Sequence, residues 1–120
     1  MINAEELNKA GISYEAGMER FMNDAELYEA VLSAFSGEDM AERAQAAFDA
    51  GDRQGLMRVA HEAKGSGGNA GLDRVYAEAN ALVKLLRSEG YTDDELTEDY
   101  RRFNEAYIAA RDAIRAALGQ

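Results

Sequence analysis

Hydrophobic side chains recur along the chain at steps of three and four residues, which is the spacing of amphipathic helices. The step is clearest near the C-terminus, where the apolar positions are Leu96, Tyr100, Phe103, Tyr107, Ala110, Ile114 and Leu118. A similar stripe precedes it, made of Leu72, Val75, Tyr76, Ala79, Leu82, Val83 and Leu86. The sequence contains no run of alternating β-branched residues that would indicate a strand, and it contains no proline. The pattern predicts an all-α protein.

Capping residues and glycines divide this pattern into separate helices. We expect two short helices near 3–9 and 14–22, then four longer ones at about 24–50, 53–69, 72–88 and 93–118. The residues expected to start helices as N-caps are Ser13, Asn23, Asp52 and Thr92. Asn23 and Thr92 also have a glutamate three residues later, which is the capping-box spacing. The glycines expected to end helices are Gly51, Gly71 and Gly90.

The segment 24–50 is the one whose helical phase is interrupted. Its apolar positions slip out of register near Ser36 and Gly37, so we interpret the segment as one long helix with a kink there. Two separate helices are the alternative. Four amphipathic helices with short connections pack as an antiparallel four-helix bundle. The sequence therefore predicts a single helical-bundle domain over residues 1–120, with short extra N-terminal helices.

Composition and charge narrow the functional classes. A chain of 120 residues without cysteine has room for one domain and fits a reducing compartment. It has neither a signal-peptide pattern nor an apolar run of the roughly 20 residues that cross a bilayer, so we expect a cytoplasmic protein without membrane association. The net charge of -10 repels phosphate backbones and argues against nucleic-acid binding. Residues 53–87 differ, because 6 basic and 3 acidic residues make them positive, and they contain the only histidine.

That histidine, His61, lies on the outward face of the predicted helix 53–69. On a helical wheel of about 100° per residue, the positions opposite His61, which we expect to face the core, are Leu56, Val59, Ala63, Ser66 and Ala70. The positions within about 60° of His61 are Met57, Arg58, Lys64, Gly65 and Gly68. A lone histidine on a bundle is most often a structural or surface residue, so this position alone assigns no function.

Three glycines follow His61 at positions 65, 67 and 68, in a chain that is otherwise rich in alanine. Each glycine inside a helix costs roughly 1 kcal/mol relative to alanine. Either this stretch is a loop, or its bare backbone lets the surface of another protein approach the imidazole. In the second case His61 is suited to accept a phosphoryl group, with the Lys64 ammonium offsetting charge on the transferred oxygens.

The stretch around His61 resembles the signature H-x-x-K-G-(S/A)-x-x-x-x-G of histidine-containing phosphotransfer (HPt) domains. It reads Ala60-His61-Glu62-Ala63-Lys64-Gly65-Ser66, with Gly71 ten residues after the histidine. Upstream residues that also look like this family are Gly11-Ile12, Gly17, Arg20-Phe21, Leu27-Tyr28, Leu32, Phe35 and Gly51-Asp52. The resemblance covers about 10–90, and the last helix matches only in being amphipathic.

This resemblance implies a role for each residue of the site. His61 would be the phosphoacceptor, Lys64 would stabilise the phosphoryl group, and Gly65 would be the small residue that opens the surface beside it. Independently of the resemblance, Met57 falls on the face of His61, where a flexible, exposed methionine suits an adaptable docking surface. We expect the surface on which a partner docks to comprise Met57, Arg58, Gly65 and Gly68. Many relatives place a polar side chain near the phosphoryl group on the following helix. Val83 occupies the aligned position here, and Asn80 and Lys84 are the candidates to replace it.

By the same resemblance, the protein is a phosphorelay intermediate. His61 would accept a phosphoryl group from the aspartyl phosphate of a response-regulator receiver domain, or from a sensor histidine kinase, and pass it to another receiver. The receiver would supply an acidic pocket and a divalent metal, so this chain would need no cofactor and no metal of its own. It would act as a monomeric phosphoryl carrier rather than as a turnover enzyme.

Two other functions stay open at this stage. The first is a fragment of a histidine kinase or dimerising phosphotransferase, which should show an ATP-binding domain or a strong dimer seam. The second is a non-catalytic interaction module on the same kind of bundle, in which His61 is not phosphorylated. The sequence fits a free-standing module and a domain of a larger protein equally.

Overall fold

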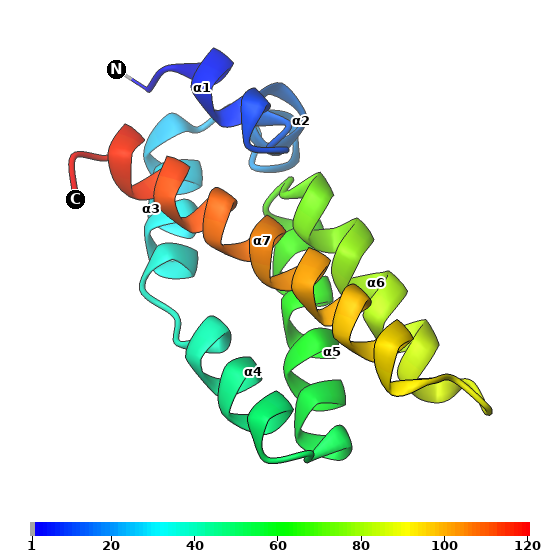
Figure 1. Ribbon diagram of the computed structural model, residues 1–120. Coiled ribbons are helices and arrows are strands. Elements are labelled where there is room, and N and C mark those ends of the chain that lie inside the picture. Colours follow the sequence, from blue (N-terminus) through cyan, green and yellow to red (C-terminus); the bar gives the residue numbers. More distant parts are fainter. Residues whose placement is uncertain (1) are drawn as a thin grey trace.

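The computed structural model describes residues 2–120, and every regular element within them is a helix (Figure 1). The helices are α1 (Ala4–Lys9), α2 (Tyr14–Arg20), α3 (Ala25–Ser36), α4 (Met40–Asp49), α5 (Arg53–Asn69), α6 (Asp73–Arg87) and α7 (Asp93–Ala117). The all-α prediction is confirmed. The two short N-terminal helices and the last three long helices lie where the hydrophobic pattern places them.

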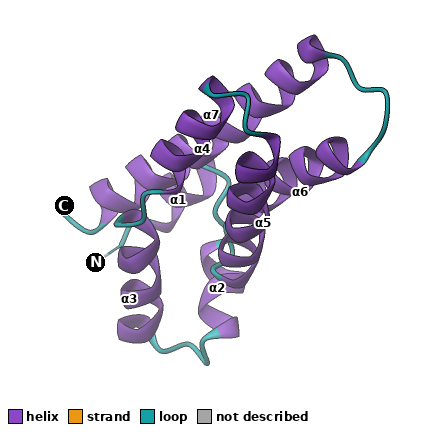
Figure 2. Ribbon diagram, turned by 90° about the horizontal axis from the view of Figure 1, so that it is seen from below, coloured by secondary structure: helices purple, strands orange, loops and turns teal. Residues whose placement is uncertain are grey.

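The bundle has four members, which are α5, α6, α7 and the pair formed by α3 and α4. α5 packs most extensively against α6 and also contacts α4, while α7 lies along α6 and reaches α3. Figure 1 shows α7 crossing the length of the molecule, and Figure 2 shows the connection between α6 and α7 projecting from one end. The predicted four-helix bundle with extra N-terminal helices is confirmed.

The short helices α1 and α2 lie over the end of the bundle where α5 ends and α6 begins (Figure 1). The Ser13 amide donates to the Gly71 oxygen at 2.9 Å, and the Arg74 amide donates to the Gly11 oxygen at 3.2 Å. Ser13 is the N-cap residue of α2, as predicted, but its side chain makes no capping hydrogen bond and donates to the Asp73 carboxylate instead. Gly71 has a φ of +77°, and a Cβ there would lie 3.1 Å from the Ser13 oxygen, so this turn requires glycine. These contacts fix the N-terminal segment to the end of α5.

The segment 24–50 forms two helices, so the prediction of one kinked helix is wrong and the alternative is confirmed. α3 ends at Ser36 and α4 begins at Met40. The Ser36 oxygen accepts hydrogen bonds from the Arg115 guanidinium at 2.7 and 3.2 Å, in place of the bond from an amide four residues on that a continuing helix would make. A side chain of α7 therefore stabilises the end of α3, and nothing within 24–50 indicates this contact.

The N-caps predicted for α5 and α7 are confirmed, and the one predicted for α3 is not. Thr92 and Glu95 form the predicted capping box, and the Asp52 side chain caps α5. α3 is capped by Asp24 and not by Asn23. Asn23 has a φ of 58°, in the left-handed region, whereas an N-cap residue is extended. The predicted capping box at Asn23 is therefore wrong.

Two tyrosine hydroxyls lie in the core, and burial raises the pKa of both Tyr28 and Tyr107 to about 12. In the unfolded chain a tyrosine loses its proton near pH 10, at about its unperturbed value. Between about pH 10 and 12 the folded protein therefore binds more protons than the unfolded chain. The contribution of these groups to stability is complete below about pH 10 and is lost as the pH rises toward 12.

Replacement of Tyr107 by phenylalanine is expected to reduce this alkaline loss. The Tyr28 hydroxyl donates to the Ala70 oxygen at 2.6 Å, whereas the Tyr107 hydroxyl has no hydrogen-bond partner among residues 2–120. Tyr107→Phe should therefore leave stability at pH 7 equal or slightly higher, and should reduce the loss near pH 11.5 by up to about 2 kcal/mol. Urea unfolding at pH 7, 10 and 11.5 measures both effects. If the stability of the wild type and of the variant depended on pH in the same way, the alkaline loss could not be assigned to Tyr107.

Candidate functional site

His61 lies in the middle of α5, and its side chain is exposed. α5 is continuous from Arg53 to Asn69, so the glycines at 65, 67 and 68 are helical and the loop interpretation of them is wrong. The helix begins after the Asp52 cap and ends before Gly71, as the sequence predicts. A regular helix therefore presents the imidazole of His61 to solvent.

The buried face of α5 is rotated toward α6 relative to the prediction. The positions that are buried as expected are Leu56, Val59, Ala63 and Ala70. Ser66, predicted to face the core, is exposed, and Gly67 is buried instead. A Cβ at Gly67 would lie 3.1 Å from Cγ1 of Val75 on α6. This close approach of α6 explains why Gly67 is buried, whereas Ser66 lies about 100° away around α5.

Lys64 follows His61 by one turn, on the flank of α5 that faces α6. Its side chain is half-buried, and its Nζ lies 6.0 Å from the centroid of the Tyr76 ring on α6. Residues three apart on a helix are neighbours on its surface. The ammonium group and the imidazole therefore belong to one face of α5, as the sequence predicts.

The opposite flank of His61 carries Arg58 and Glu62, which border a groove between α5 and α4. Arg58 is exposed. Glu62 accepts two hydrogen bonds from Arg43 of α4, at 2.9 and 3.0 Å. The bonds to Glu62, together with a bond to Asp39, raise the pKa of the Arg43 guanidinium above its usual range. Because Glu62 is paired in this way, its negative charge beside His61 is offset, which favours the approach of an anion.

The three glycines after His61 have different surroundings. No heavy atom outside the helix lies within 4 Å of the place that a Cβ of Gly65 would occupy. A Cβ at Gly68 would lie 3.0 Å from Cδ2 of Tyr76, and Gly67 has the contact with Val75 described above. The packing of α5 on α6 therefore explains Gly67 and Gly68. It does not explain Gly65, whose bare backbone opens to solvent one turn beyond His61.

The other residues predicted for the site differ in their exposure and in their place on α5 and α6. Met57, expected to be exposed, is half-buried and packs against the core. Val83, which we align with the polar residue that the resemblance leads us to expect on this helix, is buried. Asn80 follows Tyr76 by four residues and shares its stripe of α6, whereas Lys84 is exposed and lies about 80° from Tyr76 around the helix. Of the two candidates on α6, Asn80 is therefore the one on the side of Lys64.

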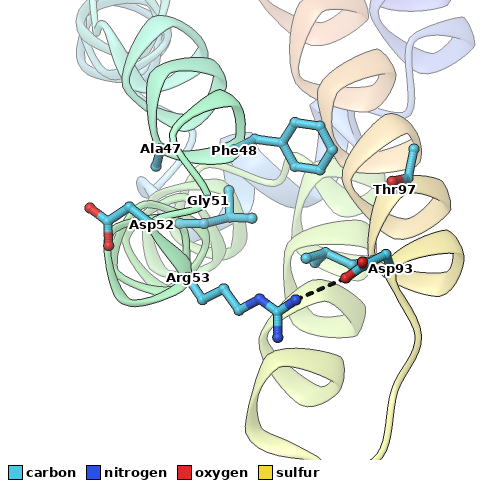
Figure 3. Close-up of a pocket in the computed structure, with 9 residues that line it drawn as sticks. Ala47, Phe48, Gly51, Asp52, Arg53, Asp93 and Thr97 are labelled. Atoms are coloured by element: carbon cyan, nitrogen blue, oxygen red, sulfur yellow. Dashed lines mark hydrogen bonds and ion pairs between the residues drawn. The ribbon is translucent and has the colours of Figure 1, made fainter.

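The pocket drawn in Figure 3 lies at the start of α5 and includes none of the predicted site residues. It has a volume of about 170 Å³ between the apolar side chains of Phe48, Leu56 and Leu96. Beside it, Arg53 donates to Asp93 at 2.9 Å (Figure 3). Within residues 2–120, no three potential metal ligands come together, and no helix has the length and apolar character needed to cross a membrane.

A family model of the Hpt domain matches residues 26–118. Because this match covers most of the chain, the protein belongs to the Hpt domain family, the histidine phosphotransfer domains that interact with response regulators and kinases in phosphorelays. No curated protein and no solved structure matches the chain. The resemblance inferred from the histidine motif is confirmed, but its extent differs. The match includes the last helix and begins after the upstream residues 10–25.

Tyr76 is the residue beside Lys64 that the sequence does not indicate. Its place in the apolar stripe of 72–88 predicts a core residue, yet 42% of it is exposed. Its ring covers Gly68 and faces Lys64. These contacts depend on the register of two antiparallel helices, which the spacing within either helix does not determine. The one signal in the sequence is Gly68, a position without a side chain where a ring from another helix can lie.

Proposed function

We propose that this protein is a histidine phosphotransfer protein of a two-component phosphorelay, in which His61 exchanges a phosphoryl group with the aspartate of response-regulator receiver domains. One observation carries the proposal: the single histidine of a chain in the Hpt family is exposed in the middle of α5. A phosphotransfer domain needs a histidine that a partner can reach, and this chain offers no other.

The transfer requires a nucleophilic nitrogen and a positive charge from this chain. A neutral nitrogen of the His61 imidazole attacks the phosphorus of the aspartyl phosphate. The nitrogen–phosphorus bond forms while the bond from phosphorus to the aspartate oxygen breaks, and the aspartate leaves as a carboxylate with the electron pair. The Lys64 ammonium, one turn away, offsets the negative charge of the transferred oxygens. Transfer to a second receiver reverses these steps.

The partner completes the site in this proposal. A receiver domain, or a sensor histidine kinase, brings the acidic groups and the divalent metal, and this chain acts as a cytoplasmic monomer that carries the phosphoryl group without turnover of its own. The positive charge of residues 53–87, against a net charge of -10 for the whole chain, complements an acidic partner site and orients its approach. Met57, Arg58, Gly65 and Gly68 surround His61 on the docking face.

Direct transfer from a labelled receiver tests the proposal. The purified chain, incubated with a ³²P-labelled phosphorylated receiver domain, is expected to acquire phosphate that is labile in acid and stable in base. Mass spectrometry should locate this phosphate on His61. Acid-stable label, or label on another residue, would contradict the proposal. If a panel of receivers and kinases bound the chain but none transferred phosphate to it, the non-catalytic interaction module would be supported instead.

Replacement of Lys64 by alanine is expected to slow phosphoryl transfer by about ten- to a hundredfold, because one group that stabilises the transferred charge is lost. Receiver binding should persist, since the rest of the docking face is unchanged. Rapid-quench measurement of the transfer rate at saturating receiver tests this effect. Arg58→Ala, on the other flank of His61, is the matched control and should change the rate much less. A larger effect at Arg58 would mean that the phosphoryl-stabilising role belongs to Arg58.

A further inference from the structure

Tyr76 is a large aromatic side chain on the surface beside the proposed phosphoryl site. It is 42% exposed on α6, although tyrosine in an amphipathic stripe normally faces the core. The ring lies against α5, where it meets the backbone at Gly68. Its exposure and its contacts call for an explanation, because neither the core nor the transfer chemistry described above uses this side chain.

Gly68 provides the place where the ring lies. A Cβ at position 68 would lie 3.0 Å from Cδ2 and 3.4 Å from Cε2 of Tyr76, so any larger residue would displace the ring. The Gly68 backbone is also held by α2, since Nη1 of Arg20 donates to the Gly68 oxygen at 2.6 Å. The helices α2, α5 and α6 therefore meet at Gly68, and together they determine where the Tyr76 ring stands.

The ring in turn faces the ammonium group of Lys64. Nζ lies 6.0 Å from the ring centroid, at the outer limit of a cation–π contact. Within residues 2–120, Lys64 forms no ion pair with a carboxylate. An aromatic face restricts a flexible lysine without neutralising its charge, whereas a carboxylate would compete with phosphoryl oxygens for it. Lys64 is thus held near His61 with its charge available.

We propose that Tyr76 is a positioning residue for phosphoryl transfer: its ring, resting on Gly68, holds the Lys64 ammonium on the face of α5 that carries His61. This inference rests on the proposed function of His61. It assigns Tyr76 an effect that acts through Lys64, and it gives Gly68 a further role, which is to support the ring.

The transfer rates of five variants test the inference. At saturating phosphorylated receiver, Tyr76→Leu is expected to slow transfer by about two- to fivefold, whereas Tyr76→Phe, which keeps the aromatic face, should match the wild type. In a Lys64→Ala background, Tyr76→Leu should cause no further loss. Tyr91→Leu is the matched control, since the Tyr91 ring faces Arg53 at 5.1 Å at the start of α5 and should not affect the rate. Thermal melts check that all variants fold.

Two results of these measurements would overturn the inference. Equal slowing by Tyr76→Leu with and without Lys64 would show that the ring does not act through the lysine. A change confined to the receiver concentration at half-saturation, with the maximal rate intact, would make Tyr76 a docking residue instead.

A second readout does not depend on phosphate. In NMR spectra the ε-protons of Lys64 should be shifted upfield by the ring in the wild type and in Tyr76→Phe, and should return to ordinary values in Tyr76→Leu. If transfer to His61 occurs but this shift is absent, only the role of Tyr76 fails. If the wild type accepts no phosphate from any donor, the proposed function fails and the role of Tyr76 fails with it, whatever the NMR spectra show.

Discussion

Replacement of His61 by glutamine is expected to abolish acid-labile phosphorylation of this protein while leaving its helical content and melting temperature nearly unchanged. The chain has no other histidine that could take up the phosphoryl group. The side chain is exposed on α5, and exposed substitutions usually change stability by less than about 0.5 kcal/mol. Autoradiography after incubation with a phosphorylated receiver measures the first effect, and circular dichroism measures the second.

Gln54→Ala is the matched control for this experiment, because Gln54 is also exposed on α5 and lies two turns before His61 on nearly the same face. It should take up phosphate like the wild type. Persistence of acid-labile label in His61→Gln would mean that histidine is not the acceptor. Unfolding of the variant would instead show that the imidazole supports the fold, contrary to its exposed position.

The sequence predicts the fold well where the information is local. The stripe of α7 from Leu96 to Ile114 is buried as its spacing requires, and the Thr92 capping box starts that helix at the expected residue. The outward direction of His61 follows from the period of an α-helix alone. The direction of the predicted phosphoacceptor face can therefore be read from α5 alone, provided that the opposite face of the helix packs in a bundle.

The sequence predicts poorly what distant residues determine. α3 ends at Ser36 through the guanidinium of Arg115, 79 residues away, so the local phase shift could not distinguish a kink from a break. Gly67 is buried because α6 approaches α5 closely at Val75, and this register is a tertiary property. The glycines after His61 look alike in the sequence, yet the structure separates those that pack on α6 from Gly65, which packs on nothing.

Gly65→Leu is therefore expected to separate stability from function. No neighbour lies within 4 Å of the Cβ position, and leucine favours a helix over glycine, so the isolated protein should gain up to about 1 kcal/mol of stability. The same side chain would stand one turn from His61 in the path of the receiver. Because a displacement of about 1 Å from the reactive geometry can cost a hundredfold in rate, the second-order rate of transfer should fall by on the order of a hundredfold.

Urea unfolding and the second-order rate of phosphoryl transfer, measured on the same preparation, decide between two reasons for the glycine. Ser66→Leu is the matched control, because the next residue of α5 is also exposed but points about 140° away from His61. A leucine there adds the same apolar surface without obstructing the imidazole, and it should transfer phosphate at nearly the wild-type rate. Undiminished transfer by Gly65→Leu would remove the steric explanation, since a partner that tolerates leucine does not need bare backbone. If Gly65→Leu loses transfer and Ser66→Leu does not, the open space beside His61 is where the receiver approaches.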